Sequence, residues 1–536
     1  MTAVHPDTGY SDTTQAAITT AREHSVGVML ARSARRQPTK TAIIDGEVTL
    51  SFAEFDAAVN RCANALSARG IGRGDRVALI GHNCWQFAVL NFATARLGVI
   101  LVPVNFGLGA EEIAFILSHS GARAVIVEDS LAGTLEAAID RAAVSIDVLG
   151  WIPLGGAAPT SGWESVNGWM TDGDDTAPAV VVADDEPIRM MYTSGTESRP
   201  KGVLLSSKSL ISQYVSCIVD GGMDGTDIEI HALPMYHCAQ LDCFLSTDIY
   251  LGATSIILPT PDPAVILATI EARRVTKLFC PPTVWISLLR HPDFDTRDLS
   301  SLRKGYYGAS PMPVEILREM SRRLPEVRLW NFYGQTEMSP LATILQPDEQ
   351  IERAGSAGRA ALNVETRVVD GEDNPVPDGE VGEIVHRSPH AALGYYADED
   401  KTAAAFANGW FHSGDLGVID KDGYLSVVDR KKDMIKTGGE NVASREVEEA
   451  IYLLDGVAEV AVFGVPHPKW IEAVAAVIVP KAGAQLTAEA VDDHLDGVLA
   501  GYKRPKYVVF AESLPKNPSG KILKKNLRTE HQGIAD

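Results

Sequence analysis

The chain has 536 residues, of which 45% are hydrophobic, and its 48 lysines and arginines against 70 aspartates and glutamates give a formal net charge of −22. A single hydrophobic core stops growing at roughly 250–300 residues, so this length predicts two or more domains. The negative charge argues against a general binder of nucleic acid or anionic membranes, but it does not exclude small anions, which respond to local clusters of basic side chains.

Neither the cysteines nor the N-terminus indicates export. The six cysteines include no Cys-x-x-Cys pair and no zinc-type histidine spacing, which is typical of reduced thiols in a cytoplasmic protein. Residues 1–24 lack the basic segment and apolar core of a signal peptide, and we expect them to be a flexible N-terminal segment. No window reaches the ~18 uninterrupted apolar residues of a membrane span. We therefore expect a cytoplasmic protein without a membrane span.

From Thr41 onward, short β-rich runs alternate with helical ones. Residues 41–51 are typical of a hairpin around Asp45-Gly46, and the apolar spacing over residues 52–69 predicts a helix. Strands are then predicted at 76–81 and 99–105 with a helix between them. Strand, helix and strand joined by short glycine-containing turns predict a parallel sheet covered by helices. The alternation recurs in β-rich runs at 122–128, 252–259, 275–282 and 302–310.

The pattern changes after residue 431. Beyond it we predict a helix over Ser444–Leu454 with Ser444 as its N-cap, strands at 457–466 and 472–480, a further helix and a lysine-rich tail. The fold class predicted from these patterns is α/β. A large multi-subdomain α/β body spans residues 25–431, and a smaller α+β C-terminal domain spans residues 432–536.

The stretch MYTSGTESRPKGVLL (residues 191–205) combines hydroxyl and glycine residues with Arg199 and Lys201. It follows an apolar run and precedes a helix that we expect to begin near Ser206-Ser207. Strand, polar loop and helix in this order can present backbone N–H groups to phosphate. The stretch lacks the GxxxxGK[ST] spacing of the common nucleotide-binding loop. Taken alone, it is equally typical of an ordinary surface loop.

Four further polar stretches follow along the chain: NFYGQTE (331–337), WFHSGDLG (410–417), DRKKDMIKTGGEN (429–441) and PKNPSGKILKK (515–525). The carboxylate of Glu337 suits a divalent metal, and the neighbouring Thr336 offers a hydroxyl to an anion. Asp415 lies in a predicted turn, where it can accept hydrogen bonds from a diol such as ribose. Each stretch alone also reads as a solvated turn, so only their order and spacing are specific.

In that order and spacing, the five stretches resemble those of the adenylate-forming superfamily, which includes acyl-CoA synthetases, luciferases and the adenylation domains of nonribosomal peptide synthetases. The resemblance runs from about Ser25 to Lys525 and is strongest to fatty acyl-CoA ligases. It implies a ligase that forms a carbon–sulfur bond. Such an enzyme joins a carboxylic acid to ATP with Mg²⁺, releases pyrophosphate, and transfers the acyl group from acyl-AMP to CoA. Activation is needed because a carboxylate has no good leaving group.

The resemblance also assigns roles to individual residues. The ATP-binding set is Thr193, Ser194, Gly195, Thr196 and Lys201 on the β- and γ-phosphates, Gly308, Ala309, Ser310, Asn331 and Tyr333 around adenine, and Asp415 and Arg430 on the ribose. Glu337 would bind Mg²⁺, and Thr336 would touch the α-phosphate. His237 matches the family's gate between the acyl pocket and the pantetheine tunnel.

The family's C-terminal domain is mobile, and Lys432 falls at its hinge. During adenylation, Lys521 would bridge the carboxylate oxygen and the phosphate, a role that suits its flexible point charge. Rotation about Lys432 would then withdraw Lys521 and bring in the GGEN segment with Lys436 for the thioester step.

The phosphate loop departs from the family pattern, because Glu197 stands where the family has threonine and Ser198 where it has glycine. Two charges ~4 Å apart interact by roughly 4 kcal/mol near a protein surface, so a carboxylate facing triphosphate would weaken binding. We expect Glu197 to point away from the ligand. Glu197→Thr should therefore keep the rate of pyrophosphate release within an order of magnitude, and a thousandfold change would contradict this orientation.

The acyl substrate is predicted from apolar segments at 235–241, 280–285, 306–312 and 338–342. These favour a medium- or long-chain fatty acid, although Gln240 and Asp242 leave a polar or ring-bearing acid open. Trp285, Trp330 and Phe332 are expected to be core residues. Two alternatives also stay open, an acyl-AMP ligase that delivers to a carrier protein and a non-catalytic acyl- or nucleotide-binding homologue. The predicted partners are the acid, ATP and CoA, and the oligomeric state is left open between monomer and homodimer.

Overall fold

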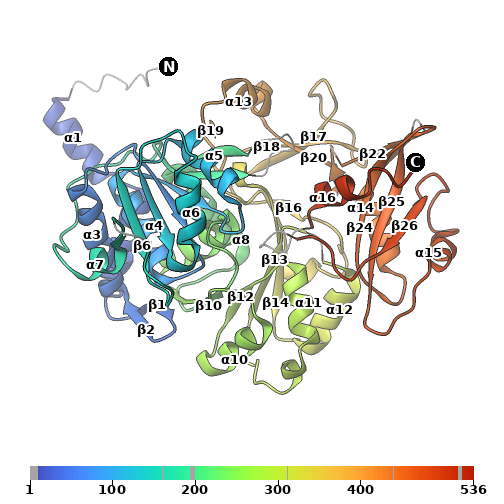
Figure 1. Ribbon diagram of the computed structural model, residues 1–536, viewed down its shortest axis with the longest axis horizontal. Coiled ribbons are helices and arrows are strands. Elements are labelled where there is room, and N and C mark those ends of the chain that lie inside the picture. Colours follow the sequence, from blue (N-terminus) through green and yellow to red (C-terminus); the bar gives the residue numbers. More distant parts are fainter. Residues whose placement is uncertain are drawn as a thin grey trace. The chain divides into compact units, whose positions relative to one another are not determined.

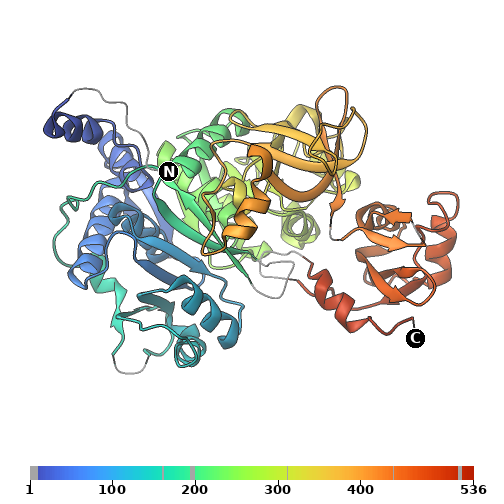
Figure 2. The same cartoon turned by 90° about the horizontal axis from the view of Figure 1, so that it is seen from above.

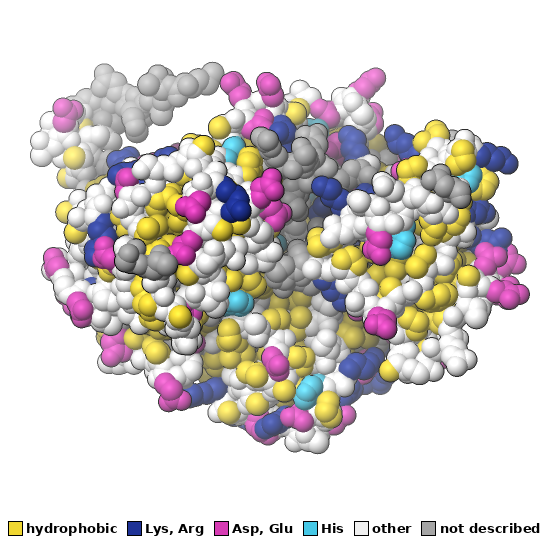
Figure 3. Space-filling model, in the orientation of Figure 1, with side chains coloured by type: hydrophobic (Ala, Val, Ile, Leu, Met, Phe, Trp, Pro, Cys, Tyr) yellow, Lys and Arg dark blue, Asp and Glu magenta, His cyan; other side chains and the backbone are white. Residues whose placement is uncertain are grey.

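In the computed structural model, residues 10–159, 162–193, 200–310, 312–431, 433–438, 440–516 and 522–535 are described (Figure 1). They fall into two compact units. Unit 1 holds the described residues of Met1–Pro261, Thr336–Pro340 and Pro389–Glu399, and unit 2 holds those of Asp262–Gln335, Leu341–Ser388 and Asp400–Asp536. Within the described ranges, no helix is long and apolar enough to cross a bilayer. On the face shown in Figure 3, basic side chains are interspersed with acidic ones.

An eight-stranded sheet forms the centre of unit 1, in the order β19-β9-β8-β4-β3-β5-β6-β7. Strands β3 to β8 run parallel, and β9 runs antiparallel to both β8 and β19. The predicted parallel sheet is therefore confirmed. Its strands are β3 (Arg76–Ile80), β4 (Ile100–Val104), β5 (Ala124–Glu128), β6 (Val148–Ile152), β7 (Glu164–Ser165), β8 (Pro187–Thr193), β9 (Lys201–Ser206) and β19 (Gly394–Tyr395).

Helices cover both faces of this sheet (Figure 1). Val77 and Leu79 of β3 pack in one core with α3 and α4, whereas Ala78 and Ile80 pack in a second core with α5 and α6. Because both faces are covered, β3, β4 and β5 are continuous apolar runs. The helices of unit 1 are α1 (Asp12–Ala21), α2 (Val26–Arg36), α3 (Phe52–Ala68), α4 (Trp85–Leu97), α5 (Ala110–Ser120), η1 (Asp129–Leu131), α6 (Ala132–Ile139), α7 (Val166–Thr171), α8 (Ser207–Gly221), the π-helix η2 (Ala239–Leu245), α9 (Ser246–Leu251) and η4 (Thr336–Met338).

Four more strands of unit 1 lie in the order β10-β11-β1-β2. They are β1 (Thr41–Asp45), β2 (Val48–Ser51), β10 (Ile228–His231) and β11 (Thr254–Ile257). The predicted hairpin is confirmed, since β1 and β2 are antiparallel and Gly46 in the turn has φ +56°. The helix predicted after the hairpin is α3, and Ser51 caps it by accepting a hydrogen bond from the backbone N–H of Glu54.

Unit 2 contains a mixed run of strands and a separate antiparallel sheet. The first has the order β16-β15-β14-β13-β12, and the second β17-β18-β20-β21. Their bounds are β12 (Lys277–Phe279), β13 (Lys304–Gly308), β14 (Arg328–Tyr333), β15 (Thr343–Leu345), β16 (Arg359–Ala360), β17 (Glu365–Val369), β18 (Gly382–Arg387), β20 (Phe411–Ile419) and β21 (Leu425–Arg430). The helices are α10 (Pro263–Arg273), α11 (Pro282–Arg290), η3 (Pro292–Asp295), α12 (Val314–Arg323), η5 (Pro347–Glu349), η6 (Ala407–Gly409) and α13 (Glu399–Ala405, whose first residue belongs to unit 1).

The C-terminal part of unit 2 has a sheet of its own (Figure 2). Two hydrophobic cores lie on its two faces. Strands lie in the order β23-β22-β25-β24, with β26 beside β25. Side chains of β24 alternate between the two cores, so Val460 and Val462 pack with α14 and α15, whereas Ala461 and Phe463 pack with Leu527 of α16. The elements are β22 (Ile435–Thr437), β23 (Glu440–Val442), α14 (Ser444–Tyr452), β24 (Val457–His467), β25 (Ile471–Pro480), α15 (Ala488–Leu495), β26 (Tyr507–Phe510) and α16 (Lys524–Glu530).

The predicted N-cap of α14 is wrong. Ser444 is the first residue of the helix, and the N-cap position is held by Ala443, which has no capping side chain. Instead the carboxylate of Asp429, on β21, accepts a hydrogen bond from the backbone N–H of Ser444. The side chain of Ser444 accepts a hydrogen bond of 2.7 Å from Lys524. A residue distant in sequence therefore caps α14, because it brings a buried carboxylate to the positive end of the helix.

We expect Asp429→Ala to destabilise α14 by about 1–2 kcal/mol, the usual cost of losing a helix cap. Asp429→Asn is the matched control, because its amide oxygen can still accept the hydrogen bond from Ser444. Hydrogen exchange of the α14 amides in the full chain measures the effect. Faster exchange in the alanine variant alone is expected, and equal exchange in both variants would contradict a capping role.

Candidate functional site

The phosphate-loop candidate begins and ends on two paired antiparallel strands. Thr193 is the last residue of β8, Lys201 is the first of β9, and the two residues are register partners. The helix α8 begins at Ser207, as predicted, but residues 201–206 form a strand rather than part of the loop. The prediction of a loop leading directly into a helix N-terminus is therefore wrong. Ser194, Gly195, Thr196, Glu197 and Ser198 lie outside the described residues.

Within unit 1, one tyrosine links the start of β9 to Glu337. The hydroxyl of Tyr395 donates a hydrogen bond of 2.9 Å to Oε1 of Glu337, and Nζ of Lys201 lies 4.8 Å from the centre of the Tyr395 ring. Glu337 and Thr336 belong to the single turn η4. The structure thus brings Lys201 and Glu337, two residues assigned from the sequence, into contact with one side chain that the sequence analysis missed.

Thr336 also contacts the segment that carries the gate candidate His237. Oγ1 of Thr336 lies 3.3 Å from Sγ of Cys238, which is buried. Burial raises the pKa of the Cys238 thiol to about 12, so it is protonated at neutral pH and unsuited to act as a nucleophile. Cys238 therefore serves as a neutral neighbour of the Thr336 hydroxyl.

Asn83 fixes the course of the chain leading to His237. Its amide nitrogen donates hydrogen bonds to the carbonyls of His231, Leu233 and Leu258 at 3.2, 2.7 and 3.1 Å. Its amide oxygen accepts a hydrogen bond of 2.8 Å from the backbone N–H of Met235. A single buried amide thereby contacts four backbone groups, which lie at the end of β10, in the segment that follows it and just beyond β11.

In unit 2, the structure brings together three residues assigned to adenosine. The hydroxyl of Tyr333 donates a hydrogen bond of 2.8 Å to Oδ2 of Asp415, and Nε of Arg430 lies 3.6 Å from Oδ1 of the same carboxylate. Asp415 and Arg430 are register partners on β20 and β21. Burial, and then the negative charge of Asp415, raise the pKa of Tyr333 well above its usual range, so the phenol remains a hydrogen-bond donor.

At the end of β13, the backbone of the neighbouring strand β14 lies very close. A Cβ at Gly308 would lie 2.4 Å from the carbonyl oxygen of Phe332, so only glycine fits between β13 and β14. The next residue, Ala309, has φ +64° and is exposed together with Ser310. A non-glycine residue in the left-handed region is strained, and such residues cluster at functional sites. Asn331 is buried, and its amide donates a hydrogen bond of 3.1 Å to the carbonyl of Ser356.

The residues assigned to the thioester step are only partly described. Lys436 is exposed on β22, and its backbone N–H donates a hydrogen bond of 2.7 Å to Glu472. The hinge candidate Lys432 and the adenylation candidate Lys521 lie outside the described residues.

Asp242 and Gln240, the two polar side chains that could have bound a polar acid, instead contact other residues of the protein. Asp242 is fully buried and pairs with Arg189, with 3.0 Å between Oδ1 and Nη2. Gln240 accepts a hydrogen bond from the backbone N–H of Leu233 at 3.2 Å, and its Nε2 lies 2.7 Å from Nδ1 of His231. The support that these two residues gave to a polar or ring-bearing acid is therefore removed. Trp285, Trp330 and Phe332 are buried, which confirms them as core residues.

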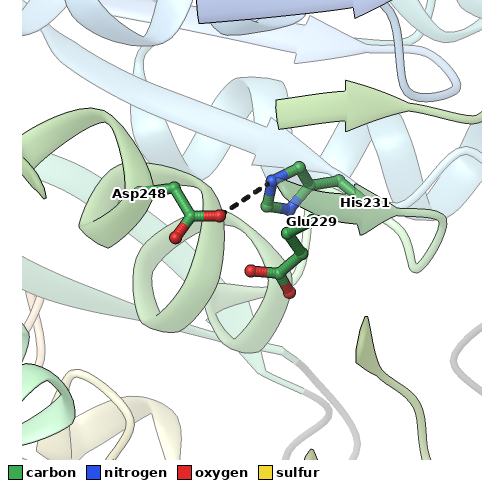
Figure 4. A group of neighbouring side chains, drawn as sticks. All are labelled: Glu229, His231 and Asp248. Atoms are coloured by element: carbon green, nitrogen blue, oxygen red, sulfur yellow. Dashed lines mark ion pairs between the residues drawn. The ribbon is translucent and has the colours of Figure 1, made fainter. Parts of the chain in front are cut away.

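A buried group of metal-ligand type also lies in unit 1, and the sequence analysis did not find it. The ligand atoms of Glu229, His231 and Asp248 lie within 4.8 Å of one another (Figure 4). Both nitrogens of the His231 ring have neighbours, since Nε2 lies 3.4 Å from Asp248 and Nδ1 contacts Gln240. We therefore interpret the group as a polar network that joins β10 to η2 and α9.

Comparisons with known proteins agree with the resemblance found in the sequence. A family model described as AMP-binding enzyme matches residues 30–396, and one described as AMP-binding enzyme C-terminal domain matches residues 446–521. A feruloyl-CoA synthase of Amycolatopsis sp is 37% identical over 95% of this chain and 99% of its own. A long-chain-fatty-acid–CoA ligase of Mycobacterium tuberculosis is 34% identical over 95% of this chain and 98% of its own.

A solved structure extends the agreement to the fold. The crystal structure of ATP-bound MatB from Rhodopseudomonas palustris superposes with a TM-score of 0.87 at 30% identity, covering 95% of this chain and 100% of that one. The fold-class prediction, an α/β body with a smaller C-terminal domain, is thereby confirmed. The chain belongs to the AMP-binding enzyme family, among the acyl-CoA synthetases and ligases of the adenylate-forming superfamily.

Proposed function

We propose that the protein is an ATP-dependent acyl-CoA ligase that forms acyl-AMP with release of pyrophosphate and then transfers the acyl group to CoA. The observation that carries the proposal is the cluster of Lys201, Tyr395 and Glu337 in unit 1, where a cation and a carboxylate flank one aromatic side chain. Binding of a metal triphosphate needs both charges, the ammonium for phosphate oxygens and the carboxylate for the cation.

Glu337 fits the Mg²⁺ that the family implies. Mg²⁺ prefers oxygen ligands and is usually held by one or two carboxylates together with substrate phosphates. The carboxylate of Glu337 is half-buried, and one of its oxygens is oriented by Tyr395. When bound with ATP, Mg²⁺ supplies positive charge against the charge that develops on the phosphates. Thr193 and Lys201 would bind phosphate oxygens, and Thr336 would donate its hydroxyl to the α-phosphate.

Asp415 is the proposed acceptor for the ribose hydroxyls. Its carboxylate accepts a hydrogen bond from Tyr333 and lies near Arg430, so both neighbours orient it. The exposed backbone of Ala309 and Ser310 would flank the adenine. Lys521 would stabilise charge during adenylation, and Lys436 would serve the thioester step. Rotation about Lys432 would turn the domain, 432–536, against the body, 25–431, so that Lys436 replaces Lys521 at the site.

For the acid we propose an aliphatic chain of medium or long length. Because Asp242 and Gln240 are committed to Arg189 and His231, neither supports recognition of a polar acid. The relatives include enzymes named for an aromatic and for a long-chain acid, so a ring-bearing acid is the nearest competitor. His237 would stand between this acid and the pantetheine arm of CoA.

Incubation with ATP, Mg²⁺ and a panel of acids, with and without CoA, tests the proposal. The panel should contain octanoate, palmitate and ferulate at equal concentration, with pyrophosphate, acyl-AMP and thioester measured separately. Thioester from octanoate or palmitate supports the proposal. Adenylate without thioester would indicate delivery to another acceptor, such as a carrier protein, and the absence of both products would indicate a non-catalytic binder. Glu337→Gln is the matched control, and it should abolish Mg²⁺-dependent pyrophosphate release.

A further inference from the structure

Tyr395 contacts two oppositely charged residues of unit 1 at once. Its hydroxyl donates a hydrogen bond of 2.9 Å to Glu337, and its ring face lies 4.8 Å from the ammonium of Lys201. The hydrogen bond fixes one carboxylate oxygen, and the ring attracts the cation through its negative face. Tyr395 therefore constrains both charges without neutralising either of them.

The backbone places Tyr395 independently of these side-chain contacts. β19 pairs with β9 at Val203 and Leu204. On either side of β19, the N–H of Ala392 donates to the carbonyl of Glu337 at 2.8 Å, and the N–H of Tyr396 donates to the carbonyl of Gly202 at 2.8 Å. The segment 392–396 is therefore tied both to η4 and to the strand that begins at Lys201.

The hydrogen-bonding chemistry of Tyr395 suits this task. An ionised carboxylate can only accept hydrogen bonds, so the phenol hydroxyl is the donor to Glu337. Residues that hydrogen-bond to a metal ligand in this way fix its orientation, and their loss typically weakens metal affinity by about 10–100-fold.

We infer that Tyr395 is a positioning residue that orients Glu337 toward the metal of a bound metal–nucleotide and holds Lys201 beside it. The inference rests on the proposed function, because it takes Glu337 as the metal ligand and Lys201 as a phosphate ligand. The two contacts of Tyr395 involve different parts of its side chain. The hydroxyl orients the carboxylate of Glu337, whereas the ring holds the ammonium of Lys201, so two substitutions can test the two contacts separately.

Tyr395→Phe keeps the ring and removes the hydroxyl, and Tyr395→Leu removes both. Tyr396→Phe is the matched control, because it deletes a hydroxyl from the neighbouring residue, whose ring lies 5.7 Å from that of His119 and not against Glu337. The direct readout is the affinity for Mn²⁺, used as a paramagnetic substitute for Mg²⁺, in the presence of a non-hydrolysable ATP analogue. Metal-free binding of the analogue and the melting temperature are measured alongside.

For Tyr395→Phe we expect Mn²⁺ affinity to fall by about 10–100-fold, with metal-free binding of the analogue within twofold of wild type. High Mg²⁺ should restore pyrophosphate release in this variant. Tyr395→Leu should in addition weaken metal-free binding of the analogue. Mn²⁺ affinity within twofold of wild type in a folded Tyr395→Phe protein would overturn the inference while the wild type remains active. A wild type that shows neither metal–nucleotide binding nor pyrophosphate release would overturn the proposed function itself.

Discussion

Lys521→Ala is expected to abolish acyl-adenylate formation and to spare thioester formation from a supplied acyl-adenylate. Adenylation brings a carboxylate against an anionic phosphate, and removing one group that stabilises developing charge typically slows such a step by about 10²–10³-fold. The thioester step starts from a neutral thiol and a mixed anhydride and would use the other face of the domain, with Lys436. Pyrophosphate release measures the first step, and CoA consumption with synthetic acyl-adenylate measures the second.

Lys525→Ala is the matched control for this experiment. Lys525 is four residues further along the same lysine-rich tail and is exposed on α16. Its loss removes a positive charge from the tail but should leave both steps near the wild-type rate. Equal loss of both steps in Lys521→Ala would contradict the scheme in which rotation about Lys432 exchanges Lys521 for Lys436.

The elements that could be predicted from the sequence are those whose signals are local. The helix α3 begins at Phe52 because Ser51 and Glu54 form a capping box, and the hairpin turns at Gly46. The cap of α14 could not be predicted in this way, since Asp429 lies 15 residues before Ser444. Likewise β9 pairs with β8 on one side and with β19 on the other, and the second pairing joins segments far apart in the sequence.

The same distinction holds for the site. Glu337, Asp415 and Arg430 were found because they belong to motifs, and the structure adds that Tyr333 and Arg430 both lie next to Asp415. Tyr395 was missed because it reaches Glu337 across 58 positions of sequence. One signal was available for the buried pair, because Arg189 interrupts the apolar run of β8, and a charge inside a buried strand requires a partner.

We expect the second large effect, on the free energy of unfolding, from the buried pair Arg189 and Asp242. Arg189 and Asp242 are 1% and 0% exposed, and Arg189 also donates a hydrogen bond to the side chain of Asn91. Removing one partner leaves an uncompensated buried charge, which typically costs about 3–5 kcal/mol, whereas replacing both with apolar residues is often neutral. Arg189→Met and Asp242→Leu should each lower the free energy of unfolding by about that amount, and the double variant should recover most of it. Urea denaturation provides the measurement.

The pair also connects two parts of the proposed site. β8 carries Arg189 and ends at Thr193. η2 begins at Ala239, directly after His237 and Cys238, and carries Asp242 three residues later. We therefore expect both single variants to weaken ATP binding as well as stability. Wild-type ATP affinity in the folded single variants would show that the pair stabilises the fold without positioning the phosphate strand.

The pH dependence of the two single variants should differ, because only one of the two charges can be removed by titration. Burial raises the pKa of Asp242 to about 6 against the opposing effect of Arg189, and without Arg189 the pKa rises further. The folded state then binds a proton more tightly than the unfolded state, so the stability of Arg189→Met falls as pH rises from 5 to 7. In Asp242→Leu, Arg189 stays protonated at pH 5 and at pH 7. The difference in free energy of unfolding between this variant and the double variant should therefore be the same at both pH values. Parallel pH profiles for the two single variants would contradict a buried charge pair at this position.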